Sequence, residues 1–242
     1  MLVIAHRGAS GEYPENSLLA IKKALEQGAD GIEIDLQYHQ ASGEFIIFHD
    51  RNLQHLTEKT GSINNYSLTQ LLTTSIGQGQ CITTLTQVIE IMPADKILNL
   101  ELKVRSCQQT LIHTLMAALT EQLSNAVNSR RITWSTLHIS SFNHHVVQHC
   151  QTLLPKVSIG ALIAHSPLDY AKFSEQMALT SVNQEVDHLN HEIVADIHQH
   201  GLACWVFTVD DIEDIQRCIA LNVDAIFTNY PARTKAIIAG AK

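Results

Sequence analysis

Short apolar runs alternate with longer amphipathic stretches along most of the chain. Residues 2–5 form a run of aliphatic side chains, and residues 15–28 then place apolar side chains three or four positions apart. The first pattern predicts a buried strand and the second an amphipathic helix. Because a tight turn cannot join two parallel strands, repeated alternation predicts parallel strands connected by helices.

Eight runs of this kind begin strand and helix units, the number found in a closed (β/α)8 barrel of about 250 residues. An open doubly wound sheet is the alternative. However, Gly77-Gln78-Gly79 is followed by Ile82 where a dinucleotide fingerprint needs its third glycine. We therefore predict an α/β fold of the TIM-barrel type. The predicted strands are residues 2–5, 31–35, 97–104, 132–139, 156–164, 179–184, 203–209 and 224–228. The predicted helices after the first are residues 107–123, 144–154, 190–201, 210–222 and 231–241.

The first helix and one hairpin have clear boundary signals. Asn16 or Ser17 can cap the helix at its start, and Gly28 can end it. Residues 44–50 form a further strand-like run, which follows the second strand after a short polar turn and should therefore return antiparallel. This return would carry His49 back toward the mouth of the barrel.

A polar, glycine-containing stretch then interrupts the regular alternation. We predict a small insertion over the barrel mouth at about residues 51–83. No linker rich in Pro, Gly, Ser or charge divides the sequence, so the prediction is a single domain over residues 1–242.

The composition fits one sizeable core and argues against several classes of partner. Of the 242 residues 45% are hydrophobic, and the mean hydropathy of +0.01 does not indicate a lipid-embedded segment. The net charge of -8 argues against general attraction to nucleic acid or to an anionic membrane. The five cysteines are widely spaced, so neither a disulfide framework nor a zinc ribbon is expected. The apolar N-terminal run is too short for a signal peptide or a membrane span, and the predicted location is the cytoplasm.

Three carboxylates lie on otherwise apolar predicted strands. Glu33 and Asp35 are two positions apart, so both side chains project from the same face of one strand, and Glu101 lies on the next barrel strand with Lys103 two positions later. In such a barrel the carboxyl ends of the strands build the active site. Carboxylates gathered there would repel one another unless a cation compensated, and hard oxygen ligands suit Mg2+ or Ca2+. We therefore expect a divalent metal at Glu33, Asp35 and Glu101.

Two histidines also follow apolar strands. His6 and His49 could divide two proton transfers between them, because histidine titrates close to neutral pH. Arg7 and Lys103 offer positive charge for a phosphodiester anion, although pairing with the nearby carboxylates is the alternative for both. Other histidines lie on or beside a polar helix and are expected to be solvated surface residues rather than metal ligands. These are His188, His191, His198 and His200.

The order and approximate spacing of these motifs resemble the glycerophosphodiester phosphodiesterase family of the cytoplasmic bacterial type. The similarity runs nearly from end to end, and each motif is weak alone while the joint match is specific. The motifs are His6-Arg7-Gly8, Pro14-Glu15-Asn16, Glu33-Ile34-Asp35, His49-Asp50 and Glu101-Leu102-Lys103, followed by Ser141-Phe142, Trp205 to Asp210 and Thr228 to Pro231.

The resemblance implies a barrel with a small insertion and metal-dependent hydrolysis of glycerophosphodiesters to glycerol 3-phosphate and an alcohol. It implies Mg2+ or Ca2+ at Glu33, Asp35 and Glu101, acid and base roles for His6 and His49, and phosphate contacts from Arg7 and Lys103. The chain departs from the family pattern where His55-Leu56-Thr57 replaces an Arg-Thr-Thr run. It also has Asp210 where Asn is frequent and Asn229 where Asp is frequent. We interpret these departures as affecting substrate preference.

Three other activities are weighed against this one. A lysophospholipase D would use the same residues but needs access to membranes, and no amphipathic anchor is evident. A carbonyl lyase would use Lys103 to form a Schiff base. A binding protein on a retired barrel would not need the complete set of histidines and carboxylates. The expected partner is a small glycerophosphodiester, without nucleic acid or stable membrane insertion, and a homodimer is left open because apolar helix faces could pair or could cover the barrel.

Overall fold

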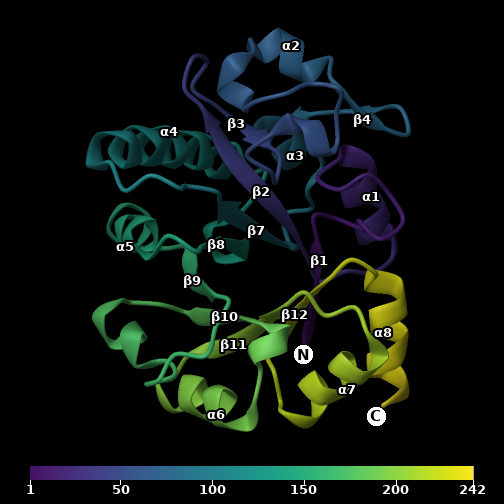
Figure 1. Ribbon diagram of the computed structural model, residues 1–242, viewed down its shortest axis with the longest axis vertical. Coiled ribbons are helices and arrows are strands. Elements are labelled where there is room, and N and C mark those ends of the chain that lie inside the picture. The colour runs from purple at the N-terminus through teal and green to yellow at the C-terminus, as the bar shows by residue number, and fades with distance from the viewer. Residues whose placement is uncertain (242) are drawn as a thin grey trace.

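The computed structural model describes residues 1–241 and contains a closed parallel barrel. Its strands are β1 (Leu2–His6), β2 (Gly31–His39), β7 (Ile97–Leu102), β8 (Leu137–Ser141), β9 (Ser158–Ile163), β10 (Ser181–Glu185), β11 (Ala203–Phe207) and β12 (Ala225–Thr228). They follow one another around the barrel in chain order, and pairing of β1 with both β12 and β2 closes it. The first and last strands consequently lie side by side (Figure 1). The predicted (β/α)8 barrel is confirmed.

Helices pack around this barrel and bury one face each. Ile21, Ala24 and Ile215 are examples of helix side chains that are fully buried beneath their helix. The strands are almost continuously buried because they contact barrel interior on one face and helices on the other. The helices are α1 (Leu18–Glu26), α3 (Leu85–Ile91), α4 (Gln109–Asn128), α5 (His144–Leu153), α6 (His191–Gln199), α7 (Ile212–Ala220) and α8 (Pro231–Gly240). No helix within residues 1–241 combines the length and the apolar character that crossing a membrane requires.

The strict alternation of strand and helix fails at one connection. Between β9 and β10 the chain forms only a short 3-10 helix, Lys172–Gln176. The predicted strand at residues 132–139 also begins later than expected, because Trp134–Thr136 forms a 3-10 turn before β8. Helix α4 begins and ends later than predicted. Its apolar stripe continues through Ala126, which is buried.

The structure shows which of the two candidates, Asn16 or Ser17, is the N-cap of α1. Ser17 is the N-cap, since its hydroxyl accepts a hydrogen bond from the backbone N–H of Ala20 at 3.0 Å. Asn16 instead has a φ of 58° and turns its amide toward β2. The structure therefore assigns the cap to Ser17 and leaves Asn16 free for another contact.

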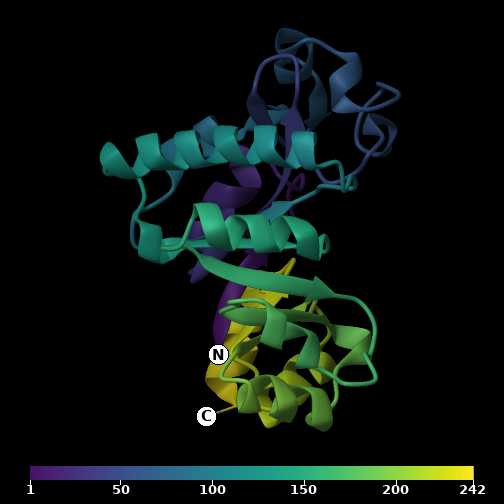
Figure 2. The ribbon, with the colours of Figure 1, turned by 90° about the vertical axis from the view of Figure 1, so that its left-hand side faces the viewer.

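The predicted hairpin is confirmed, and a small substructure follows it. Strand β3 (Glu44–Ile47) pairs antiparallel with β2, with Leu36 opposite Ile47. Figures 1 and 2 show the following segment at the opposite end of the molecule from α6. A second apolar cluster, which includes Phe48, Leu53 and Leu71, fills this segment. Its elements are the 3-10 helices Leu53–His55 and Ile63–Asn65, α2 (Leu68–Leu72), β4 (Ser75–Gly77), β5 (Gln80–Cys81) and β6 (Thr83–Thr84). That this segment is an insertion within a single domain stays a prediction.

Candidate active site

Three buried carboxylates meet at the carboxyl end of the barrel. Glu33 and Asp35 project from β2, and Glu101 projects from β7 in register with Asp35. Each residue offers one oxygen, and these oxygens all lie within 4.8 Å of one another. The three residues are 2%, 0% and 8% exposed, respectively, so their charges have almost no contact with solvent.

Without a cation, the three carboxylates repel one another and are unfavourable in their charged forms. Burial raises the pKa of Glu33 well above its usual value, and the charges of Asp35 and Glu101 raise it further. Burial, together with Asp35, raises the pKa of Glu101 to about 7. Burial alone would also raise the pKa of Asp35, but Lys103 and Arg7 outweigh this effect and lower it to about 2. Two of the three carboxylates are thus costly to ionise together.

One carboxylate oxygen provides a direct test of whether a cation fits. Oε2 of Glu33 accepts a hydrogen bond from the backbone N–H of Arg7 at 2.9 Å. Its other oxygen, Oε1, is buried and has no hydrogen-bond partner within residues 1–241. A buried carboxylate oxygen without a partner carries a large desolvation cost, which a bound cation would offset. The oxygen-only donor set suits Mg2+ or Ca2+, so the residues fit a divalent metal.

Arg7 and Lys103 flank the carboxylates as partly buried cations. The Nε atom of Arg7 lies 3.1 Å from Asp35 Oδ2, and Nζ of Lys103 lies 3.1 Å from Asp35 Oδ1 and 2.5 Å from Glu101 Oε1. Both contacts at Asp35 are ion pairs without hydrogen-bond geometry. Burial alone would lower the pKa of Lys103, but Asp35 and Glu101 outweigh it and raise the pKa above its usual value. A lysine kept charged in this way is a poor Schiff-base nucleophile.

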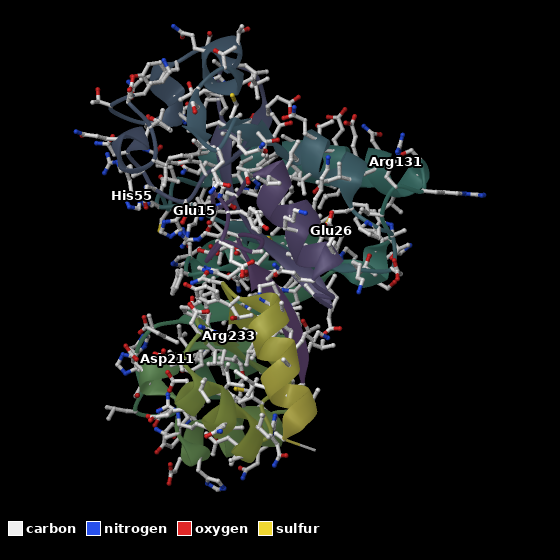
Figure 3. The ribbon with its side chains drawn as sticks, turned by 90° about the vertical axis from the view of Figure 1, so that its right-hand side faces the viewer. Glu15, Glu26, His55, Arg131, Asp211 and Arg233 are labelled. Atoms are coloured by element: carbon white, nitrogen blue, oxygen red, sulfur yellow. The ribbon has the colours of Figure 1, made fainter. Side chains whose placement is uncertain are left out.

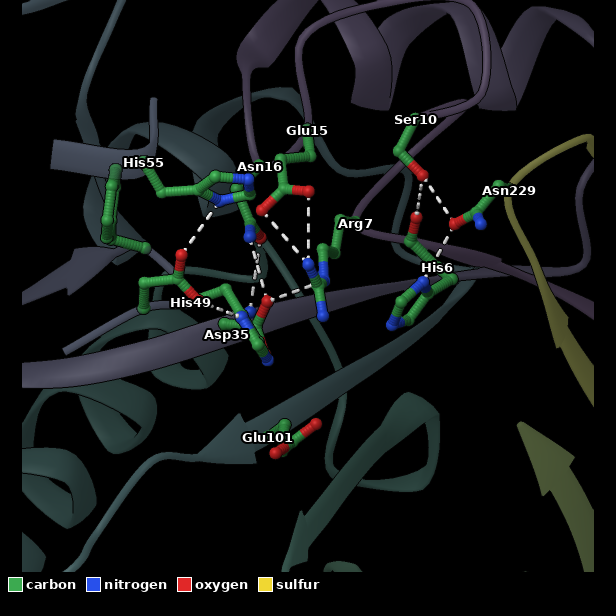
Figure 4. Close-up of polar contacts among 12 residues, drawn as sticks. His6, Arg7, Ser10, Glu15, Asn16, Asp35, His49, His55, Glu101 and Asn229 are labelled. Atoms are coloured by element: carbon green, nitrogen blue, oxygen red, sulfur yellow. Dashed lines mark hydrogen bonds and ion pairs between the residues drawn. The ribbon is translucent and has the colours of Figure 1, made fainter. Parts of the chain in front are cut away.

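Two residues of the loop before α1 complete the support of Asp35 and Arg7. Nδ2 of Asn16 donates to Asp35 Oδ2 at 2.8 Å, while Oδ1 of Asn16 accepts from the backbone N–H of Asp35 at 3.2 Å. Glu15 accepts two hydrogen bonds from Nη1 of Arg7, both at 3.0 Å. Figure 4 shows Glu15 and Asn16 on the same side of the site, above Asp35 and Arg7.

The two histidines come from different segments and have different partners: His6 ends β1, and His49 lies just after β3. Nδ1 of His49 lies 2.7 Å from Asp50 Oδ1, and the second oxygen of Asp50 lies 2.8 Å from Nδ1 of His55. Nδ1 of His6 lies 2.8 Å from Oδ1 of Asn229. Burial, with Arg7 beside it, lowers the pKa of His6 to about 4, and burial also lowers the pKa of His49.

These groups open onto a cleft of about 490 Å³. His6, Arg7, His49, Glu101 and Lys103 line it on the barrel side. The rest of its rim combines aromatic and acidic side chains, and the rings of Phe142 and Phe207 meet edge to face with centroids 5.7 Å apart. The acidic rim residues are Glu185, Asp187, Asp210, Asp211 and Asp214. In Figure 3, Glu15, His55 and Asp211 lie toward one side of the molecule and Arg131 toward the other, so the cleft occupies one end of the barrel.

The chain matches the Glycerophosphoryl diester phosphodiesterase family over residues 6–233. It belongs to this family. It is 30% identical to a glycerophosphodiester phosphodiesterase of Caldanaerobacter subterraneus subsp. tengcongensis, over 95% of this chain and 94% of that protein. A solved phosphodiesterase of Oleispira antarctica, in complex with the product sn-glycerol-3-phosphate, is 29% identical. It superposes with a TM-score of 0.88 over 99% of this chain and 97% of that one.

A third comparison supports the fold alone. A glycerophosphodiester phosphodiesterase of Parabacteroides distasonis is 23% identical and superposes with a TM-score of 0.84, over 100% of this chain and 98% of that one. Family membership therefore rests on the sequence matches, and the barrel fold rests on the structure and its superpositions.

All seven residues chosen from the sequence lie around one carboxylate cluster. These are His6, Arg7, Glu33, Asp35, His49, Glu101 and Lys103. Asn16, Asn229 and Asp210 support these residues through hydrogen bonds. The sequence assigned them no such role, because a hydrogen bond between distant loops leaves no local pattern. Asn16 was considered only as a helix cap, and Asn229 with Asp210 only as departures from the family pattern. Their positions in the motifs Pro14-Glu15-Asn16 and Thr228 to Pro231 were the available signal.

Proposed function

We propose that this chain hydrolyses glycerophosphodiesters to glycerol 3-phosphate and an alcohol, using Mg2+ or Ca2+. The observation that carries the proposal is the buried Glu33, Asp35 and Glu101 cluster, with an unpartnered oxygen, in the cleft that His6 and His49 also line. The family match and the product complex of the Oleispira antarctica relative support the same reaction.

Glu33, Asp35 and Glu101 would hold the metal. Bound there, a divalent ion would supply Lewis-acid chemistry and would offset the mutual repulsion of the three carboxylates. Arg7 and Lys103 flank the cluster, each 3.1 Å from an oxygen of Asp35, and they would stabilise negative charge on the phosphate as the reaction proceeds.

His6 and His49 would carry the two proton transfers. The attacking oxygen comes from water or from the 2-hydroxyl of the substrate's glycerol, and in the second case a cyclic phosphate forms and is then opened. Either route removes one proton from the attacking oxygen and delivers one to the departing alkoxide. Two histidines at one cleft can divide these tasks.

The test is release of glycerol 3-phosphate by the purified protein from glycerophosphocholine and glycerophosphoethanolamine. It is measured with Mg2+, with Ca2+ and after treatment with EDTA. Release that stops with EDTA and returns with one of the two ions is expected. Release that EDTA does not change would contradict the metal role, and no release from folded protein would contradict the activity.

Two additions to the same assay address the alternatives. Lysolipids test a lysophospholipase D, and borohydride trapping with carbonyl substrates tests a lyase that uses Lys103. The cytoplasmic location and the homodimer stay predictions.

A further inference from the structure

A chain of polar contacts runs from His6 through Asn229, the residue after β12, to Asp210. Oδ1 of Asn229 lies 2.8 Å from Nδ1 of His6, and Nδ2 of Asn229 donates to Oδ2 of Asp210 at 2.6 Å. The backbone N–H of Asn229 donates to the other oxygen of Asp210 at 2.8 Å. Figure 4 shows the amide of Asn229 above the ring of His6, with Ser10 beside it.

This network fixes which way the amide of Asn229 faces. The carboxylate of Asp210 accepts hydrogen bonds, so it requires the NH2 group of Asn229 on its side. Oδ1 of Asn229 must then face His6 and also the hydroxyl of Ser10, which lies 2.7 Å away. Reversing the amide would place an oxygen against the carboxylate of Asp210.

The direction of the amide in turn determines the tautomer of His6. An amide oxygen has no proton to donate, so Nδ1 of His6 must carry the proton that joins it to Asn229. A neutral imidazole with a proton on Nδ1 has a lone pair on Nε2. No hydrogen bond to Nε2 occurs within residues 1–241, and the ring lines the cleft. His6 therefore presents an acceptor to the substrate.

We propose that Asn229 is a positioning residue: oriented by Asp210, it holds His6 with its proton on Nδ1 and so makes His6 the general base. The proposal rests on the function proposed above. Nε2 of His6 takes the proton of the attacking oxygen as that oxygen bonds to phosphorus, and Nδ1 remains bonded to Asn229 throughout. The proton for the departing alkoxide comes from a second group, which leaves His49 as the general acid. As the bond from phosphorus to the leaving oxygen breaks, His49 gives its proton to that oxygen; the proton on His6 then passes to solvent and His49 takes one back from solvent.

The partner of His49 is consistent with this division. Asp50 presents a carboxylate to Nδ1 of His49 at 2.7 Å, and this contact opposes the lowering of the His49 pKa that burial causes. His6 has the neutral oxygen of Asn229 in the same place. The two histidines thus differ in the charge of the group behind the ring.

The first test reads the tautomer without reference to activity. The protein is labelled with 15N in its 14 histidines, and the His6 signals are identified by their absence from His6→Gln protein. At pH 7 the nitrogen shifts of His6 in wild-type protein should show a protonated Nδ1 and an unprotonated Nε2. A protonated Nε2 would overturn the proposal even if the enzyme were fully active. Since this measurement needs no turnover, failure of the proposed reaction leaves it interpretable.

Three variants then test the positioning role through kcat and KM. Asn229→Ala should give a mixture of His6 tautomers and lower kcat by about tenfold or more with little change in KM, because the base is mispositioned rather than the substrate released. Asn229→Asp places two carboxylates in contact and should be equally impaired. Adding Asp210→Asn to that variant restores one amide and one carboxylate, and should recover the Nδ1-protonated tautomer and most of kcat. No recovery in the folded double variant, or an unchanged kcat in Asn229→Ala, would overturn the proposal.

Discussion

Asn16 holds Asp35 through both ends of its amide. The Nδ2 atom donates to Asp35 Oδ2 at 2.8 Å and Oδ1 accepts from the backbone N–H of Asp35 at 3.2 Å, while Asn16 itself is 2% exposed. Its φ of 58° places the amide over β2, a conformation that asparagine adopts more readily than most residues. This contact orients a proposed metal ligand from a loop that precedes it by 19 positions.

We predict that Asn16→Ala lowers metal affinity and turnover by about tenfold to a hundredfold, the usual effect of removing a residue that orients a metal ligand. The measurement is metal titration of the purified variant followed by assay at saturating metal. Asn222→Ala is the matched control, because Asn222 also has a positive φ, 56°, but lies in the turn after α7. If both variants lose the same affinity, backbone strain rather than the amide contact explains the effect.

The carboxylate cluster predicts a pH-dependent stability of the metal-free protein. The pKa of Glu101 is about 7 in the folded protein against a usual 4.5, so the folded state binds more protons than the unfolded state between these values. The contribution of Glu101 to the free energy of unfolding in EDTA should therefore fall as pH rises from 4.5 to 7, by roughly 1–3 kcal/mol. Thermal unfolding of wild type and Glu101→Gln at pH 5.5 and pH 8 isolates this contribution, because the lowered pKa values of the buried His6 and His138 act in the opposite direction in both proteins.

A divalent metal should reverse that trend, because it binds the ionised carboxylates. Its stabilising effect should be larger at pH 8 than at pH 5.5. Glu33→Gln is predicted to be more stable than wild type in EDTA at pH 8, since one of three neighbouring charges is gone, and yet inactive with metal. A variant less stable than wild type under those conditions would show that repulsion among the three carboxylates is not the main destabilising effect in the metal-free protein.

The parts of the fold that follow periodicity were predictable, and the parts that depend on tertiary contacts were not. The order of barrel strands and the β2–β3 hairpin follow from apolar runs and a short polar turn. The 3-10 segment Lys172–Gln176 does not, because the pattern predicted no element between the strands at residues 156–164 and 179–184. For the site, the alternation along β2 correctly placed Glu33 and Asp35 on one face.

The departures at Asp210 and Asn229 show where the reasoning from sequence was incomplete. They were interpreted as affecting substrate preference, whereas Asn229 contacts His6 directly and Asp210 contacts Asn229. Since these residues lie on different loops, 19 positions apart, only the folded chain shows that the two changes form one pair.

The contrast between two neighbouring histidines provides a test of acid–base catalysis. Nδ1 of His49 and Nδ1 of His55 bind different oxygens of Asp50, but only His49 lines the cleft. We predict that His49→Ala lowers kcat by about a hundredfold or more. His55→Ala removes a contact to the same carboxylate and should retain turnover within a few-fold. Equal losses of kcat in the two folded variants would show that the loss of a histidine contact to Asp50, and not the loss of proton transfer by His49, lowers the rate.

The acidic rim of the cleft predicts a preference between substrates of different charge. Asp187 and Asp211 line the cleft, are exposed, and form no salt bridge within residues 1–241. Carboxylates there would attract a cationic head group and the nearby face of Phe207 could contact it, whereas a neutral polyol gains neither interaction. Glycerophosphocholine should therefore have a lower KM than glycerophosphoglycerol. In Asp187→Asn/Asp211→Asn protein the KM for glycerophosphocholine should rise about threefold to tenfold at low salt, with the KM for glycerophosphoglycerol unchanged. Asp95→Asn, an exposed carboxylate outside the cleft, controls for the change in net charge. Equal shifts for both substrates would mean that the rim acts on the phosphodiester anion that they share rather than on the head group.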